Sequence, residues 1–384
     1  MVTATMRLTA VIIFFTTSGT KNAYEGQKMS LLYFLGRIKL HSLLKIQKRV
    51  LPDLIQVMQK RYHILKFIGM MEPVGRRSLS QNLGMTERVL RSEVQFLKEQ
   101  DLISISSTGM SLTQDGKEIL DELDSLMGKI TGLHELAQQI KERFSIKHVV
   151  VVSGNSDESP WVKSELGRAT VQSMKRCLKD KNIIAVTGGT TMASIADSLS
   201  PEFTTNEVIF VPARGGIGED VENQANTICA KMAAKTNAKH KVLYLPDEVT
   251  KDLYDSFIKD PNIKEVLTLI QSANIVLHGI GDALTMAERR KTRKEALEKI
   301  IERKAVGEAF GYYFNENGEV VHKVQTVGLQ LEDLQNVEHI FAVAGGASKG
   351  KAISSYLKQA PKGTILITDE SAALQLLKGE PFKI

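Results

Sequence analysis

The sequence predicts an α/β protein in two parts: a small, basic, mostly helical domain followed by a larger domain built on a parallel sheet. The length of 384 residues is enough for about two domains. Basic charge is concentrated early, because residues 45–98 hold 11 Lys and Arg against 4 Asp and Glu, whereas the chain after them is net acidic. From residue 147 onward, short apolar runs alternate with helical patterns, which indicates parallel strands covered by helices on both faces.

The composition is that of an ordinary globular protein, with 42% hydrophobic and 24% charged residues. Cys177 and Cys229 lie in apolar helical patterns without metal-ligand spacing, so we predict neither disulfides nor a metal site. This cysteine usage fits the reducing cytoplasm. Residues 1–39 are predicted to be a disordered or non-native extension. Their apolar run is too short to span a membrane, and a signal-peptide core is the alternative.

Residues 40–113 are predicted to form the small domain. Apolar residues recur at helical spacing over residues 43–69, and a shorter helix is predicted around residues 78–83. Thr86 is a good N-cap for a third helix, and the alternation around residues 107–109 predicts a hairpin. This is the element order of a winged helix-turn-helix, in which the second helix of the pair enters the major groove of DNA.

The third helix separates into an apolar stripe and a polar face. The predicted stripe is Val89, Leu90, Val94 and Leu97. The residues predicted to face operator double-stranded DNA are Thr86, Glu87, Arg88, Arg91, Ser92 and Gln95. Arg76 and Arg77 are expected to precede the shorter helix and, with Ser78, to contact DNA phosphates. A charged three-helix unit that binds a protein partner is the alternative.

Residues 114–144 are predicted to be a linker helix, which either packs on the chain or forms a dimer contact. Residues 145–384 are predicted to form a Rossmann-like α/β domain. Its expected strands are residues 148–152, 182–186, 207–211, 241–245, 274–280, 339–345 and 364–368. Ligands of such sheets bind at the carboxyl ends of the strands.

The turn after the second of these strands has the features of a phosphate site. Thr187 leads into Gly188, Gly189, Thr190 and Thr191, and a helical pattern follows at once. Glycines allow close backbone approach, and the N–H groups at a helix start favour an anion. No Lys follows, so this is not a Walker motif. Simple helix capping is the alternative.

Other strand ends carry cations and amides. The residues in question are Arg214, Gln224, Arg289, Arg290 and Lys349, the last in a second glycine-rich turn. Together they predict a pocket with two anionic ends, as a bisphosphate requires. Glu308, before a hairpin with its turn at Asn317-Gly318, is expected to accept sugar hydroxyls, an ordinary surface Glu being the alternative.

At this point the chain resembles the SorC/DeoR-type sugar-responsive repressors of low-GC Gram-positive bacteria. The segments that carry the resemblance include "EPVGRRSLSQNLGMTERVLRSEVQFLKEQ", "AVTGGTT", "VPARGG", "HGIGDALTMAERR", "EAFGYYFN" and "AVAGGASK", and the match covers nearly all of the chain from residue 43. The resemblance implies a repressor of triose-phosphate genes of glycolysis, with a sugar-isomerase-like effector domain and no cofactor.

The resemblance also implies the ligand and the site. Fructose 1,6-bisphosphate, or a related glycolytic sugar phosphate, is the implied inducer, and the implied assembly on DNA is a homo-oligomer between dimer and tetramer. The effector-site positions carried over are Gly188, Gly189, Thr190, Thr191, Arg214, Gln224, Arg289, Arg290, Glu308 and Lys349.

A sugar-phosphate isomerase or deaminase with an added DNA-binding domain is the alternative function. The deaminase motif continues as Gly-x-Gly-x-Asp-Gly-His, whereas here Asp282 is followed by Ala283 and Leu284. His278 precedes the glycines and is expected to be structural. Because no acid–base pair is complete, we predict that the protein has no catalytic residues and is not an enzyme.

Overall fold

The computed structural model describes residues 52–83, 85–203, 206–216, 220–246, 256–257 and 259–378. The prediction for residues 1–39 falls outside this part of the chain. The chain divides into two compact units, and the division falls after Leu123. The first unit includes Thr86–Leu123 and the described residues up to Leu79, and the second includes Asp124–Ile384 together with Ser80–Met85. Each unit is described by itself.

The first unit has the predicted helix, helix, helix and hairpin order. Its elements are α3 (Pro52–Met71), α4 (Arg76–Leu83), α5 (Glu87–Glu99), β1 (Ile103–Ser106) and β2 (Gly109–Leu112). The hairpin is antiparallel, and Val74 adds a bridge to Met110 through hydrogen bonds of 3.0 and 2.9 Å. Gly109 has φ +142°, and a Cβ there would lie 2.9 Å from the backbone of Val74, so only glycine fits. The winged helix-turn-helix fold is confirmed.

Two sequence predictions for this unit are wrong in detail. Val89 is 43% exposed and does not belong to the apolar stripe; α5 buries Leu90, Glu93, Val94 and Leu97 instead. Glu93 occupies part of the buried face, because Lys60 and Arg61 of α3 form ion pairs with its carboxylate. Arg76 and Arg77 do not precede α4 but form its first turn, where no acidic residue is present.

The predicted linker helix is two helices, α6 (Gln114–Ile130) and α7 (Leu133–Phe144). The break falls at Gly132, whose φ of +79° is left-handed and cannot continue an α-helix. The predicted single helix is therefore wrong at this point.

The second unit is built on a parallel seven-stranded sheet in the order β3-β13-β12-β7-β4-β5-β6. The strands are β3 (His148–Val152), β4 (Lys181–Val186), β5 (Glu207–Pro212), β6 (Lys239–His240), β7 (Ile275–Gly279), β12 (His339–Val343) and β13 (Thr364–Asp369). Alternate residues face opposite sides: Ile184 and Val186 pack on one side of the sheet and Ala185 on the other. The continuous apolar runs in the sequence follow from burial on both faces.

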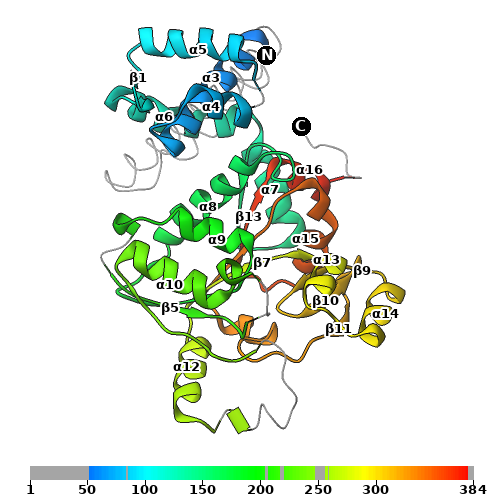
Figure 1. The fold of residues 1–384 in the computed structure, drawn as a ribbon. Coiled ribbons are helices and arrows are strands. Elements are labelled where there is room, and N and C mark those ends of the chain that lie inside the picture. The colour runs from blue at the N-terminus through cyan, green and yellow to red at the C-terminus, as the bar shows by residue number, and fades with distance from the viewer. Residues whose placement is uncertain are drawn as a thin grey trace, which may run out of the picture. The chain divides into compact units, whose positions relative to one another are not determined.

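Helices cover both faces of this sheet. One face packs on α8 (Pro160–Lys175), α9 (Thr190–Asp197) and α10 (Ala225–Thr236). The other packs on α7, α12 (Pro261–Gln271), α15 (Gly350–Leu357) and α16 (Glu370–Leu376). Figure 1 shows α8, α9 and α10 in green along one side of the sheet. The Rossmann-like α/β architecture is confirmed, and the carboxyl ends of its strands meet at one edge.

The predicted strand at residues 241–245 is wrong. The strand in this region is β6, which has two residues, and the chain leaves the sheet after it. Asn226 explains the departure: its side-chain amide accepts from Leu243 N–H and donates to Leu243 O, both at 3.0 Å. These bonds take the place of a neighbouring strand.

A second, antiparallel sheet extends the domain. It has the order β11-β10-β9-β8, with β8 (Gly281–Asp282), β9 (Ala305–Ala309), β10 (Tyr312–Asn315) and β11 (Val320–Lys323), and it packs with α13 (Ala283–Arg289) and α14 (Lys294–Glu302). The predicted turn at Asn317-Gly318 joins β10 and β11, and Gly318 has φ +85°. Four short 3-10 helices complete the described elements: η1 (Pro201–Phe203), η2 (Val221–Asn223), η3 (Glu332–Asn336) and η4 (Ala347–Lys349).

Across the described residues, no helix is long and apolar enough to cross a membrane. The same residues contain no cluster of His, Cys, Asp and Glu that could hold a metal ion. Cys229 is buried in α10, and Cys177 lies half-buried just beyond α8; both are free thiols.

Candidate functional site

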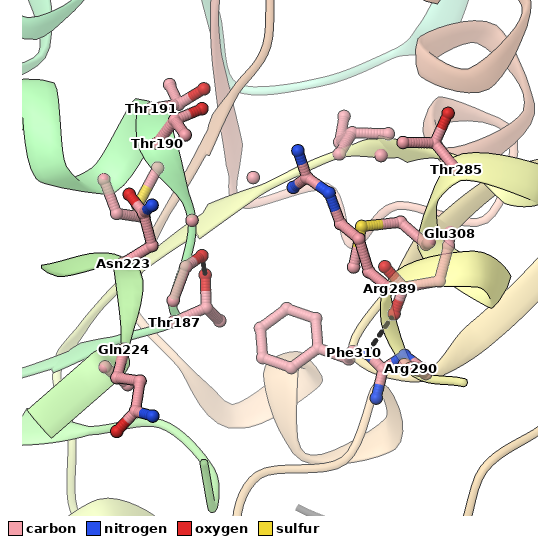
Figure 2. A pocket seen from close by; sticks show the side chains of 18 of the residues that line it. Thr187, Thr190, Thr191, Asn223, Gln224, Thr285, Arg289, Arg290, Glu308 and Phe310 are labelled. Carbon is pink, nitrogen blue, oxygen red and sulfur yellow. Dashed lines mark hydrogen bonds and ion pairs between the residues drawn. The ribbon is translucent and has the colours of Figure 1, made fainter. Parts of the chain in front are cut away.

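A pocket of about 540 Å³ lies at the carboxyl edge of the parallel sheet. All ten residues predicted for a ligand site line it, from Gly188 and Gly189 to Lys349. Figure 2 shows two walls: Thr187, Thr190, Thr191, Asn223 and Gln224 on one side, and Thr285, Arg290 and Glu308 on the other, with the Phe310 ring between them. The side chain of Arg289 extends into the space between them.

The first wall is the start of α9. Gly189 has φ +120° and caps the helix, and its N–H donates to Asn223 O at 2.8 Å. A Cβ on Gly188 would also lie 2.8 Å from Asn223 O, so the turn packs too closely for any other residue. The N–H groups of the first helical turn have no partner within the helix, and the helix dipole favours an anion there. The hydroxyls of Thr190 and Thr191 add two donors.

Two cations, Arg289 and Lys349, line the same pocket as this helix start. Within the described chain, neither Arg289 nor Lys349 has a carboxylate at ion-pair distance. Burial lowers the pKa of the Lys349 ammonium, and the positive charges of Lys163 and Arg289 lower it further. Like charges gathered at a partly buried site are unfavourable until an anion neutralises them. This region therefore has the charge and the donors of a phosphate site.

The opposite wall is a buried charge cluster. Glu308 on β9 accepts from Arg290 Nη2 at 2.9 Å and from Gly311 N–H at 2.6 Å, and its carboxylate lies 3.9 Å from Arg214 Nη1. The three charged side chains are at most 6% exposed. Two guanidinium groups therefore contact this one buried carboxylate.

The second glycine-rich turn, which carries Lys349, differs from the turn at the start of α9. Its donors already have acceptors: Gly346 N–H donates to Asp369 at 2.7 Å, and Ser348 donates to Asp157 through both its N–H and its hydroxyl at 2.9 Å. Lys349 contributes to the pocket through its side chain alone. The amides of this turn are taken by carboxylates that are remote in sequence.

The amides near the pocket divide into two roles. Gln224 lines the pocket as the N-cap residue of α10, and Asn223 precedes it in η2. Asn226, by contrast, is committed to Leu243 and has a structural role.

His278 is structural, as expected. It is fully buried on β7, with Nδ1 3.0 Å from Gly279 O and Nε2 2.9 Å from the Tyr356 hydroxyl. Burial lowers the pKa of His278 to about 4, so the ring is neutral at neutral pH, with Nδ1–H donating to Gly279 O and Nε2 accepting from Tyr356. Asp282 caps α13 by accepting from Thr285 N–H and its hydroxyl, both at 3.0 Å. His278 is therefore engaged in the fold through both ring nitrogens, and Asp282 through one carboxylate oxygen.

Several pocket residues were not predicted from the sequence. They include Asp220, Asn223, Thr285 and Phe310. Phe310 is 3% exposed, has φ +54°, and its ring centroid lies 4.9 Å from that of His278. Left-handed Phe is uncommon, and the dipeptide Phe310-Gly311 between two strand patterns was the available signal for this tight turn.

The candidate nucleic-acid surface is the exposed face of α5. Arg88, Arg91, Ser92 and Gln95 are exposed and share this face, and Thr86 caps the helix by accepting from Val89 N–H at 3.4 Å. In the described structure no carboxylate pairs with Arg88 or Arg91. Gln95 donates to Glu99 at 2.9 Å.

The buried face of α5 carries an ion-pair cluster that sequence analysis missed. Glu93 lies 2.5 Å from Lys60 and 2.9 Å from Arg61, and the Arg61 guanidinium lies 3.6 Å from the centroid of the Phe96 ring. Although burial opposes ionisation, the hydrogen bonds from Lys60 and Arg61 lower the pKa of Glu93. Part of the basic surplus therefore fixes α5 on α3 and is not available for phosphates.

A winged helix-turn-helix unit followed by an α/β unit with a strand-end pocket defines a class: transcriptional regulators that bind DNA and a small molecule. Family models agree with both units. Residues 57–127 match the "CggR N-terminal DNA binding domain" and residues 128–378 match the "Putative sugar-binding domain".

Similar proteins show which family of transcriptional regulators the chain belongs to. The central glycolytic genes regulator of Priestia megaterium is 56% identical over 340 residues, which cover 88% of this chain and 99% of that protein. The protein of the same name from Bacillus subtilis is 53% identical over 341 residues, or 89% and 100% of the two chains. A crystal structure of a SorC family transcriptional regulator from Enterococcus faecalis shares 45% identity, covers 64% of this chain and all of that one, and gives a TM-score of 0.61. The chain belongs to the central glycolytic genes regulator family of SorC-type transcriptional regulators.

Proposed function

We propose that this protein represses glycolytic genes by binding operator DNA and that fructose 1,6-bisphosphate, bound in the second unit, releases it. The observation that carries the proposal is the pair of cationic regions in one pocket. One is the helix start of α9 with Arg289 and Lys349, and the other is the cluster around Glu308.

The two regions suit the two ends of a bisphosphate. The first offers backbone and threonine donors with two cations that have no carboxylate at ion-pair distance in the described chain. The second holds the guanidinium groups of Arg214 and Arg290, and the Glu308 carboxylate between them can accept sugar hydroxyls. A sugar monophosphate would use only one region and should bind more weakly.

The bound sugar phosphate acts in this proposal as a signal and is not turned over. His278 and Asp282 are committed to hydrogen bonds within the fold, and the similar proteins above are named as regulators. An isomerase or deaminase requires a group free to move a proton between substrate atoms.

Release of DNA follows from a population shift between two arrangements of a homo-oligomer, between dimer and tetramer. The ligand favours the arrangement in which the winged helices no longer match the operator spacing. Its effect on DNA affinity is limited by the difference between its affinities for the two arrangements. Since it acts on chromosomal DNA, we place the protein in the cytoplasm.

The test uses a fluorescent duplex selected from a randomised pool by the full-length protein. Anisotropy titrations are run without ligand, with fructose 1,6-bisphosphate, with fructose 6-phosphate and with fructose. The bisphosphate should weaken DNA binding at the lowest concentration, and fructose should have no effect. Equal potency of all three sugars would contradict the proposed ligand.

A separate measurement distinguishes a signal from a substrate. Phosphorus NMR of fructose 1,6-bisphosphate incubated with stoichiometric protein should show the unchanged compound. A new phosphorus resonance that grows with time and requires the pocket would support the enzyme alternative.

A further inference from the structure

Val89 is an apolar side chain on an otherwise polar surface. It lies in the first turn of α5, is 43% exposed, and has Arg88 beside it and Ser92 one turn later. The apolar core of this unit is supplied by other residues of the helix, since Leu90, Val94 and Leu97 are at most 3% exposed. Val89 therefore leaves a large part of its hydrophobic side chain exposed to solvent.

The side chain is also not needed to form the helix. The N-cap bond from Thr86 is made to the backbone N–H of Val89, so it survives any change of side chain. A β-branched residue is slightly unfavourable in an exposed helix position. The helix does not require valine at this position. We therefore ask which partner its side chain could contact.

The surroundings of Val89 indicate a polyanionic partner. Arg88 precedes it in the chain and Arg91 lies further around the same helix; neither has a carboxylate at ion-pair distance in the described chain, and Arg76 and Arg77 are exposed in the first turn of α4. In a helix-turn-helix, the residues near the start of the recognition helix contact the base edges. The apolar feature that the major groove offers there is the C5-methyl group of thymine.

We propose that Val89 is a specificity-determining residue that contacts a thymine methyl group in the operator. This inference rests on the proposed function and on α5 as its recognition helix. The arginines around Val89 provide affinity for phosphates and guanines, whereas Val89 distinguishes thymine from cytosine and from a base without the methyl group.

The experiment removes methyl groups from the DNA in one set of measurements and from the protein in another. The full-length protein first selects its duplex from a randomised pool. Each thymine is then replaced in turn by deoxyuridine, which lacks only the methyl group, and binding is measured by anisotropy at fixed salt. At one thymine per half-site, wild-type affinity should fall about 4-fold, the cost of losing one buried methyl-sized group.

The Val89→Ala variant should bind the thymine duplex about 4-fold more weakly and should be insensitive to uridine at that same position. The matched control is Ile119→Ala, which truncates another exposed apolar residue, 39% exposed on α6. It should keep the wild-type uridine profile. Thermal unfolding verifies that both variants remain folded.

The proposal is overturned if Val89→Ala retains the wild-type response to every uridine, or if the selected duplex contains no thymine at which the methyl group matters. A protein that selects no duplex at all contradicts the proposed function itself, so the two failures are distinguishable.

Discussion

At the residue scale, the pocket shows how a charge that is unfavourable in the free protein prepares a ligand site. Lys349 lies near Lys163 and Arg289, and burial and these neighbours lower the pKa of its ammonium. A bound phosphate dianion reverses both effects, because it favours the charged form. Burial and repulsion between like charges destabilise the free site, and a bound phosphate relieves both.

This lowered pKa predicts a pH dependence of ligand affinity. Free protein loses the Lys349 proton at a lower pH than an ordinary lysine, whereas the phosphate-bound form retains it. Binding therefore takes up a proton at alkaline pH, and affinity for fructose 1,6-bisphosphate should fall as pH rises through the lowered pKa. Calorimetric titrations across the alkaline range measure the fall. The Lys349→Arg variant remains charged and should lack it; an unchanged fall in that variant would assign the effect to another group.

The threonines after the two glycines give a second prediction. Replacing both Thr190 and Thr191 by valine keeps their volume but removes two donors to a charged oxygen, each contributing roughly 1.5–3 kcal/mol. Affinity for the bisphosphate should fall by at least about 100-fold, and repression should become insensitive to it. Thr268→Val, on the exposed side of α12, is the control. A double variant that responds at wild-type concentrations would show that the phosphate binds elsewhere.

At the scale of elements, a strand-end turn is local and was predictable, whereas contacts between remote segments were not. The sequence from β4 to α9 contains its own signals: an apolar run, two glycines and a helix pattern. The occupied amides of the second glycine turn depend on Asp157, 191 residues away from Ser348. The early end of β6 similarly depends on Asn226, and no periodicity in residues 241–245 could show it.

The helix pattern of α5 illustrates the same limit. Spacing alone placed Val89 in the apolar stripe, because it cannot show that a buried glutamate accompanied by Lys60 and Arg61 occupies part of the core face. Charge counting likewise located the basic domain but not which of its cations are neutralised within the fold.

The exposed face of α5 predicts separable functions. Arg91→Ala should weaken binding to the selected duplex by about 1–3 kcal/mol, the range for an arginine reading a base, and should leave calorimetric binding of fructose 1,6-bisphosphate unchanged. Arg303→Ala, an exposed arginine just beyond α14, is the matched control. Equal losses of DNA and ligand affinity in Arg91→Ala would contradict the assignment of the two functions to separate units.

At the scale of the whole molecule, the basic first unit predicts a strong salt dependence. If Arg76, Arg77 and Arg88 each neutralise a phosphate, each chain's contribution to DNA affinity should fall roughly 40-fold between about 50 and 200 mM salt. Anisotropy titrations over this range measure the slope. A flat response would favour a protein partner for this unit.

In the whole molecule, binding of ligand to the pocket and binding of operator DNA must change each other's affinity. A ligand that weakens DNA binding by some factor must itself be bound more weakly, by the same factor, when DNA is present. This reciprocity does not depend on which arrangement of subunits carries the effect. It fails only if the two sites are independent or if the ligand is consumed.

The most direct test is therefore the affinity of the protein for fructose 1,6-bisphosphate, measured by calorimetry with and without saturating selected duplex. We expect the duplex to weaken ligand binding by the factor by which the ligand weakens DNA binding. Equal ligand affinities in the two titrations, with DNA bound throughout, would contradict the conclusion that this pocket controls the DNA-binding unit.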